Sequence, residues 1–184
     1  MKETLKYSIL AAALLWCCTQ ASAQRTMPGR SSVAIMGGWN GPSVSAGAFF
    51  SQYTLNGFWE AGIVGHDYTL PMSVGGRLRY DHVAACGGYQ FRLVANRSRS
   101  ANLYGGGGVF VGAELVDPVR ELPDYLSLPV PSRSFLFGIY AKTEAEFFIG
   151  RRLAITVEAG SQLTPSNKLR LVGFIAGLGL KLIL

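Results

Sequence analysis

Eight charged side chains fall at positions that a folded sheet would turn toward its interior. They lie in segments in which every second residue is apolar or small, and they occupy the positions in between. These residues are Glu60, Arg92, Glu114, Lys142, Glu144, Glu146, Glu158 and Lys181. Charges in a low-dielectric interior must be paired, because desolvation is costly. Five carboxylates and three cations nearly balance, so the pattern predicts an ion-pair network that plugs the interior. The alternative is a polar path for ions or solutes.

The two histidines of the chain, His66 and His82, are candidates for a catalytic base. They flank one predicted loop that contains Ser73, and some lipid-modifying barrel enzymes use a histidine with a serine or carboxylate. Neighbouring residues on a strand point to opposite faces, so Asp67 and Asp81 are badly placed to orient the adjacent histidines. A nucleophile also needs a base within hydrogen-bond reach. The simpler interpretation is two interfacial polar residues, and we predict no catalytic residue.

Metal and phosphate chemistry have weaker signals. The two histidines and Cys86 have no zinc-ligand spacing. The glycine run Gly105 to Gly108 lacks the Lys-Ser/Thr and the helix of a phosphate-binding loop. It is better explained as the lining of a crowded interior. We therefore expect no metal, no cofactor and no small-molecule substrate.

The elements that position these side chains are strands in which apolar and polar residues alternate. Between 134 and 149, Phe135, Phe137 and Ile139 fall on one parity and Lys142 and Glu144 on the other. Side chains on a strand point to opposite faces in turn, so each strand presents one apolar and one polar wall. We expect eight strands, at about 32–39, 43–54, 58–69, 77–94, 101–115, 134–149, 151–162 and 168–183.

Connection lengths favour a membrane barrel over a soluble sandwich. Every second connection is a tight turn, at 55–57, 95–100 and about 150, whereas the others include 70–76 and the long 116–133. Short turns at one end and longer loops at the other are typical of outer-membrane barrels. The fold class predicted is therefore all-β, a small antiparallel transmembrane β-barrel of about eight strands. An interior of this size is just wide enough for side chains to fill.

The N-terminus has the features of a cleaved signal peptide. Two lysines precede an apolar run from Tyr7 to Cys18, and Ala21-Ser22-Ala23 forms a small-residue cleavage site. The apolar run is shorter than a membrane-spanning helix requires, and Trp16 fits poorly beside a lipidated cysteine. We expect 1–23 to be a signal peptide and 24–184 to be the barrel domain, exported to the outer membrane.

Charge and cysteine content exclude other classes. The whole chain carries a net charge of +6, and the part after residue 23 carries +5. Its basic pairs lie at predicted turns and form no stripe, so direct nucleic acid binding is not expected. Solvated turns or lipid headgroups explain them more simply. Only Cys86 remains after residue 23, so no intrachain disulfide is possible.

The proline-rich loop 116–133 is the best candidate for binding a partner. Its four prolines limit the backbone before docking and so lower the entropy lost on binding. The contact residues we expect are Arg120, Tyr125, Leu126 and Leu128. A lid folded over the barrel mouth is the alternative.

The sequence resembles the TraO family of conjugative transposon proteins from Bacteroides-type bacteria. The similarity runs from Gln24-Arg25-Thr26-Met27-Pro28-Gly29-Arg30 through Trp59-Glu60 and Gly87-Gly88-Tyr89-Gln90-Phe91. It continues through Gly150-Arg151-Arg152-Leu153 to Ala176-Gly177-Leu178-Gly179-Leu180-Lys181. Leu184 departs from the aromatic residue that such barrels usually place last.

The resemblance implies a non-enzymatic accessory of the mating apparatus that transfers DNA. Other conjugation proteins of the cell envelope would then be its partners, together with outer-membrane lipid. It supplies no catalytic residues. A lipid-modifying barrel enzyme, or a general surface barrel of the OmpA or OmpX type, is the alternative.

Overall fold

The computed structural model describes residues 28–40, 43–71, 77–96, 100–117, 133–166 and 172–184. Eight strands make up its regular structure: β1 (Ser31–Asn40), β2 (Ser43–Tyr53), β3 (Gly57–Pro71), β4 (Arg77–Ala95), β5 (Ala101–Asp117), β6 (Arg133–Ile149), β7 (Leu153–Leu163) and β8 (Val172–Ile183). No helix in the described ranges is both long and apolar enough to cross a membrane.

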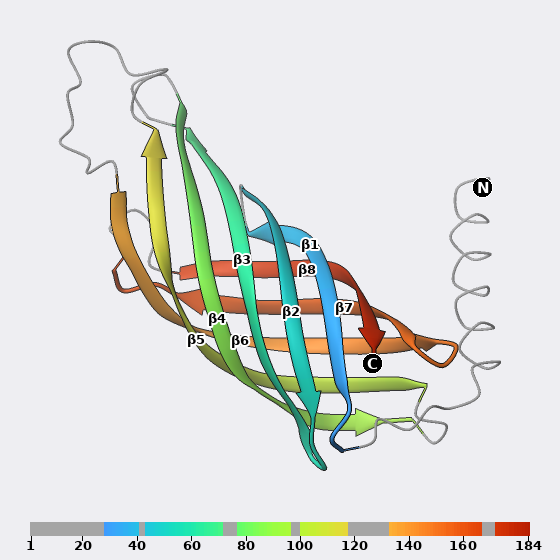
Figure 1. Cartoon of the computed structure of the whole chain (residues 1–184). Coiled ribbons are helices and arrows are strands. Elements are labelled where there is room, and N and C mark those ends of the chain that lie inside the picture. The colour runs from blue at the N-terminus through green and yellow to red at the C-terminus, as the bar shows by residue number, and fades with distance from the viewer. Residues whose placement is uncertain (1–27, 41–42, 72–76, 97–99, 118–132, 167–171) are drawn as a thin grey trace, which may run out of the picture.

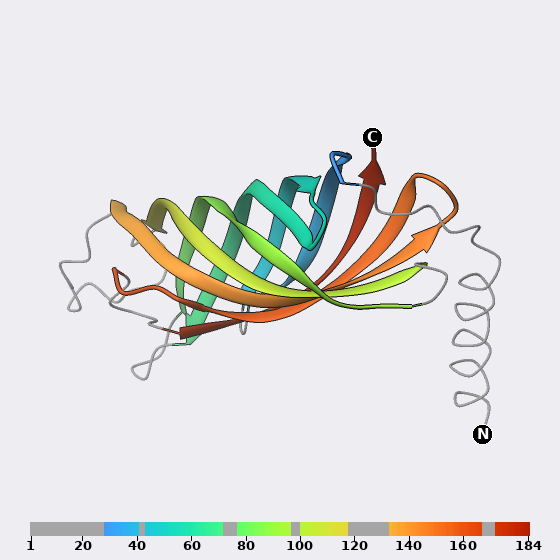
Figure 2. The same ribbon diagram turned by 90° about the horizontal axis from the view of Figure 1, so that it is seen from below.

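The strands form one closed antiparallel barrel in chain order. Each strand pairs with its sequence neighbours, and β1 closes the sheet by pairing with β8 from Ser32↔Ile183 to Trp39↔Ala176. The strands are long, inclined and strongly coiled, as Figures 1 and 2 show. Closure leaves no unpaired sheet edge, which is what a strand structure needs to reside in lipid.

The predicted fold class is confirmed, including the number of strands. Most predicted strand bounds lie within about two residues of the observed ones. For the last strand, the part of the prediction before Val172 falls on 168–171, outside the described residues. The predicted signal peptide also lies outside them and stays a prediction.

Alternation sorts the side chains between the two walls of the barrel. Large apolar residues are exposed on the outside, among them Ile35, Trp59 and Phe174 at 62%, 60% and 71%. Their neighbours on the other parity are buried inside the barrel. An apolar exterior around a polar interior is the pattern of an outer-membrane barrel.

Interior glycines make room for the large aromatic side chains. A β-carbon at Gly138 would lie 2.5 Å from the ring of Phe110, its cross-strand neighbour. A β-carbon at Gly88 would lie 2.6 Å from the hydroxyl of Tyr140. The glycines on the inner parity therefore set where Phe110 and Tyr140 fit inside a narrow barrel.

Candidate functional site: a charged plug across the barrel interior

Lys142 lies at the centre of a buried network of charges. Its Nζ is 3.0 Å from Glu60 Oε2 on β3, 3.0 Å from Glu158 Oε2 on β7 and 3.5 Å from Glu144 Oε2 on its own strand. The Lys142 side chain is 4% exposed. One ammonium group thus links three carboxylates from three strands across the interior.

Lys181 on β8 extends the network toward the end of the barrel with the short turns. Its Nζ lies 2.5 Å from Glu144 Oε1 and 2.7 Å from Glu146 Oε1. Glu144 therefore bridges the two lysines, one oxygen to each. The ammonium of Lys181 also lies 4.4 Å from the ring centroid of Phe58, within reach of a cation–π attraction. The ion pairs form one connected cluster, the charged plug: Glu60, Lys142, Glu144, Glu146, Glu158 and Lys181.

Neutral donors complete the charged plug. Tyr140 Oη and Gln90 Nε2 both donate to Glu60 Oε1, at 2.8 and 3.0 Å. Tyr53 Oη donates to Glu146 Oε1 at 2.5 Å. Four carboxylates face only two ammonium groups here, so these donors stabilise negative charge that the lysines leave uncompensated. The sequence interpretation missed all three, although their positions on the inner parity indicate an interior location.

Two of the eight predicted network residues lie elsewhere. Glu114 is buried, but its Oε2 lies 2.9 Å from His82 Nε2 and not beside a lysine of the charged plug. Arg92 is only partly buried, and its guanidinium donates to the carbonyl of Leu55 at 2.6 Å. The expectation that Arg92 joins the network is wrong, because it lies near the end of β4, where the turn carbonyl is within its reach.

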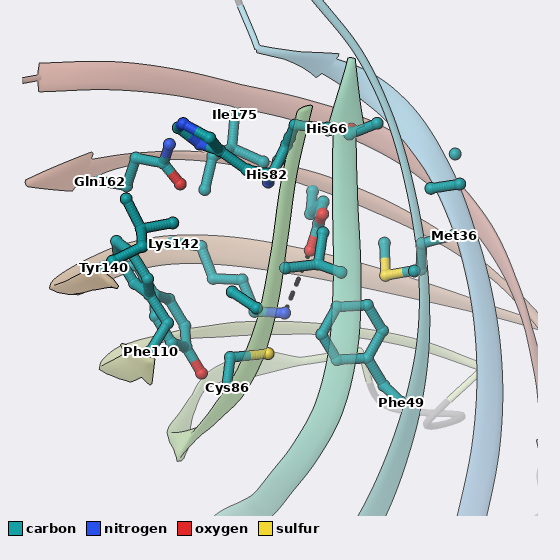
Figure 3. A pocket seen from close by; sticks show the side chains of 18 residues that line it. Met36, Phe49, His66, His82, Cys86, Phe110, Tyr140, Lys142, Gln162 and Ile175 are labelled. Carbon is teal, nitrogen blue, oxygen red and sulfur yellow. Dashed lines mark hydrogen bonds and ion pairs between the residues drawn. The ribbon is translucent and has the colours of Figure 1, made fainter. Parts of the chain in front are cut away.

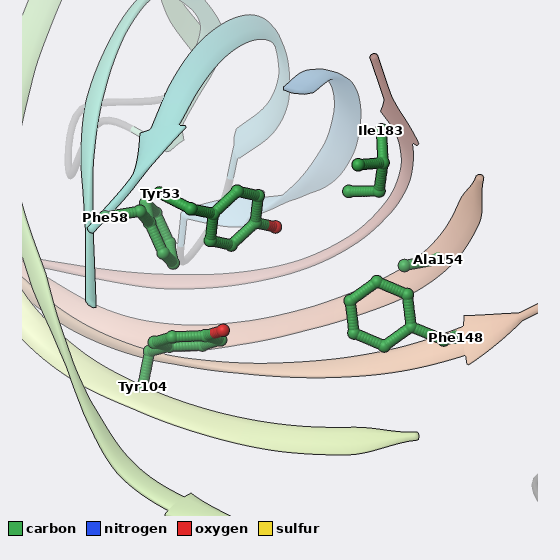
Figure 4. Close-up of a cluster of buried hydrophobic side chains, with 6 residues drawn as sticks. All are labelled: Tyr53, Phe58, Tyr104, Phe148, Ala154 and Ile183. Carbon is green, nitrogen blue, oxygen red and sulfur yellow. The ribbon is translucent and has the colours of Figure 1, made fainter. Parts of the chain in front are cut away.

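The two ends of the charged plug meet different surroundings. Toward the short turns, Tyr53, Phe58, Tyr104, Phe148, Ala154 and Ile183 form a buried hydrophobic cluster, shown in Figure 4. Toward the other end lies a cavity of about 60 Å³. Figure 3 shows Lys142 on its wall, with His66 and His82 on one side and Phe49 and Cys86 on the other. A space of this size holds a few water molecules.

The histidines lie inside the barrel and not at its lipid interface. His66 and His82 are 7% and 3% exposed, and their ring centroids are 6.5 Å apart. His82 pairs with Glu114, which faces it across β4 and β5 in the register. Ser73 lies outside the described residues.

No metal centre is found within the described residues, where no three His, Cys, Asp or Glu side chains gather suitably. Cys86 is a free thiol that lies 3.6 Å from the carbonyl of Gly62. The predicted partner-binding residues Arg120, Tyr125, Leu126 and Leu128 fall in 118–132, outside the described residues. Their role stays a prediction.

These features define the class: an eight-stranded barrel of the outer-membrane type, with an interior filled by side chains. Solved barrels share the fold. Ail of Yersinia pestis aligns with TM-score 0.55 and 11% identity over 86% of this chain and 100% of that one. Neisserial surface protein A aligns with TM-score 0.53 and 9% identity, over 83% of this chain and 94% of that one. The N-terminal barrel of Pseudomonas aeruginosa OprF aligns with TM-score 0.51 and 11% identity, over 85% of this chain and 98% of that one.

A family model identifies the family of this chain. The family model described as conjugative transposon protein TraO matches residues 63–184. The chain belongs to the TraO family, and the resemblance noted in the sequence is thereby confirmed. No curated protein matches the chain. The distant barrels show the fold alone.

Proposed function

We propose that this protein is a non-enzymatic outer-membrane component of the apparatus that transfers a conjugative transposon. Its role is structural: it anchors or stabilises the transfer machinery and passes no DNA through its own interior. Membership of the TraO family supports the link to conjugation. The observation that carries the structural role is the charged plug, which occupies the barrel interior with ion pairs from β3, β6, β7 and β8.

The histidines do not favour the enzyme alternative. His82 is 3% exposed, and its Nε2 is occupied by Glu114. A lipid substrate on the outer surface of the barrel would not reach a base held inside it. We therefore assign the His82–Glu114 pair to filling the interior.

A transfer assay tests the proposed function. Deletion of the gene should reduce conjugative transfer to the detection limit, and the wild-type gene in trans should restore it. The variant His66→Gln/His82→Gln should restore transfer equally well, because glutamine can still donate to Glu114 but cannot act as a base. Heat-modifiable migration of the unboiled protein confirms that each variant folds. Normal transfer without the gene would refute the role, and loss of transfer in a folded histidine variant would favour the enzyme.

The loop proposal has a separate test. We propose that Arg120, Tyr125, Leu126 and Leu128 contact another envelope protein of the apparatus. Removing residues 120–130 should leave the barrel folded but lower both transfer and co-purification of other transfer proteins. If co-purification is unchanged in a folded loop deletion, the loop is a lid or a spacer and the partner binds elsewhere.

A further inference from the structure

Among the described residues, four arginines lie at the end of the barrel with the short turns. This arginine rim consists of Arg30 before β1, Arg92 near the end of β4, and Arg151 and Arg152 in the β6–β7 turn. Backbone hydrogen bonds tie their segments to neighbouring strands. Arg30 accepts from Tyr53 N at 2.8 Å, Arg92 donates to the carbonyl of Asn56 at 2.7 Å, and Arg152 accepts from Ile183 N at 2.7 Å. The arginines therefore lie around one end of a closed sheet.

Among the described residues, the arginine rim contains no aspartate or glutamate, although Leu184, whose N–H donates to Ser31 O at 2.9 Å, brings its terminal carboxylate to the same end. The described turn and strand-end segments 28–31, 54–56, 91–96 and 149–152 contain neither aspartate nor glutamate. Glu146, the inner carboxylate toward this end, is fully buried and bound to Lys181. The opposite end carries charges of both signs, since Asp67 on β3 and Asp81 on β4 lie there together with Arg77 and Arg79 on β4. The four arginines therefore leave an excess of positive charge at this end.

The apolar outer wall continues up to the arginine rim. Ile149 and Leu153, which flank the arginine pair, are 43% and 38% exposed. Beside Arg92, the ring of Tyr89 packs edge to face against those of Trp59 and Phe91, with centroids 4.7 Å apart in each pair. Aromatic girdles mark the membrane–water interface of such barrels. The arginine rim is therefore expected near the level of the lipid headgroups.

We propose that the arginine rim binds the phosphate groups of anionic phospholipids in the leaflet at this end. Guanidinium groups form paired hydrogen bonds with phosphate oxygens, and clustered cations at a membrane surface concentrate anionic lipid. An acidic segment of a partner protein has the same charge. The lipid is favoured because exposed apolar side chains surround the arginines on the outer wall.

The two outward-facing tryptophans of the barrel can test the proposal from opposite ends. Trp59 lies beside the arginine rim, whereas Trp39 lies near the far end of β1, and they are 60% and 65% exposed. Two single-tryptophan proteins are made, Trp16→Phe/Trp39→Phe and Trp16→Phe/Trp59→Phe. Each protein is folded into phosphatidylcholine vesicles that contain either brominated phosphatidylglycerol or the same fraction of brominated phosphatidylcholine. The quenching of tryptophan fluorescence by the two brominated lipids is then compared.

Brominated phosphatidylglycerol should be enriched about two- to fivefold over brominated phosphatidylcholine around Trp59. Around Trp39, the ratio of brominated phosphatidylglycerol to brominated phosphatidylcholine should be about one. The variant Arg30→Gln/Arg92→Gln/Arg151→Gln/Arg152→Gln, made in the Trp59 protein, should bring the ratio to about one. High salt should do the same to the wild-type rim. If the two brominated lipids quench Trp59 equally in a folded protein with the wild-type rim, the proposal is overturned. An acidic protein segment is then the partner to seek. Enrichment that survives the arginine substitutions would overturn it as well.

Discussion

Lys142→Met should lower the free energy of unfolding by about 3–5 kcal/mol, because it leaves buried carboxylates without their cation. The methionine keeps nearly the volume of the lysine, but its side chain is one heavy atom shorter and has no ammonium group. Glu60 and Glu158 each lose a contact of 3.0 Å, and Glu144 keeps only Lys181. Urea unfolding in detergent or vesicles, followed by heat-modifiable migration, measures the change.

Two further variants separate electrostatics from packing in this experiment. Measured in detergent, where the arginine rim has no anionic lipid to bind, Arg152→Met removes a cation from an exposed turn residue and should change stability by no more than about 0.5 kcal/mol. Adding Glu158→Gln to Lys142→Met removes one of the carboxylates that have lost their cation. The double variant should therefore recover part of the lost free energy of unfolding. If Lys142→Met is no more harmful than Arg152→Met, the ion pairs do not hold the interior together.

The ion pairs need not make the barrel more stable than an apolar filling would. Replacing buried ion pairs by well-packed apolar residues is often neutral or stabilising, whereas removing one partner alone is costly. The charged plug joins the three neighbouring strands β6, β7 and β8 to β3, which is not adjacent to any of them in the sheet. Its consequence for function is that it occupies the space that a conduit would need.

Strand alternation is the part of the structure that the sequence predicts well. It places Glu60, Lys142, Glu144 and Lys181 on the interior wall, because parity alone decides which face a side chain takes. Parity does not decide which residues meet. The pairing of His82 with Glu114 depends on the register of β4 and β5, which the turn between them sets and residue types do not reveal.

Arg92 shows a second limit of reasoning from parity. It occupies the inner parity of β4, but the register of β4 against β5 shifts between Arg92 and Val94. A long side chain near a strand end can turn toward a turn carbonyl, and Arg92 reaches that of Leu55. Tyr53 was missed for a related reason. A tyrosine that ends a strand is expected at an interface, and its bond to Glu146 depends on how the barrel closes.

A closed interior should show no ion conduction. The charged plug crosses the interior, the hydrophobic cluster of Tyr53, Phe58 and Tyr104 lies on one side of it, and the cavity on the other side measures about 60 Å³. Eight-stranded barrels leave room only for side chains or one small ligand. Under the proposed function, DNA transferred by the apparatus passes by another route.

The most direct test of a structural role for this barrel is the single-channel conductance of the purified, folded protein in planar bilayers. A donor strain lacking the gene, complemented by the same protein, shows that the material tested is active in transfer. The wild-type protein should insert without stable openings over the usual voltage range. Stable, reproducible openings from a transfer-competent protein would contradict a sealed structural barrel and point to a conduit.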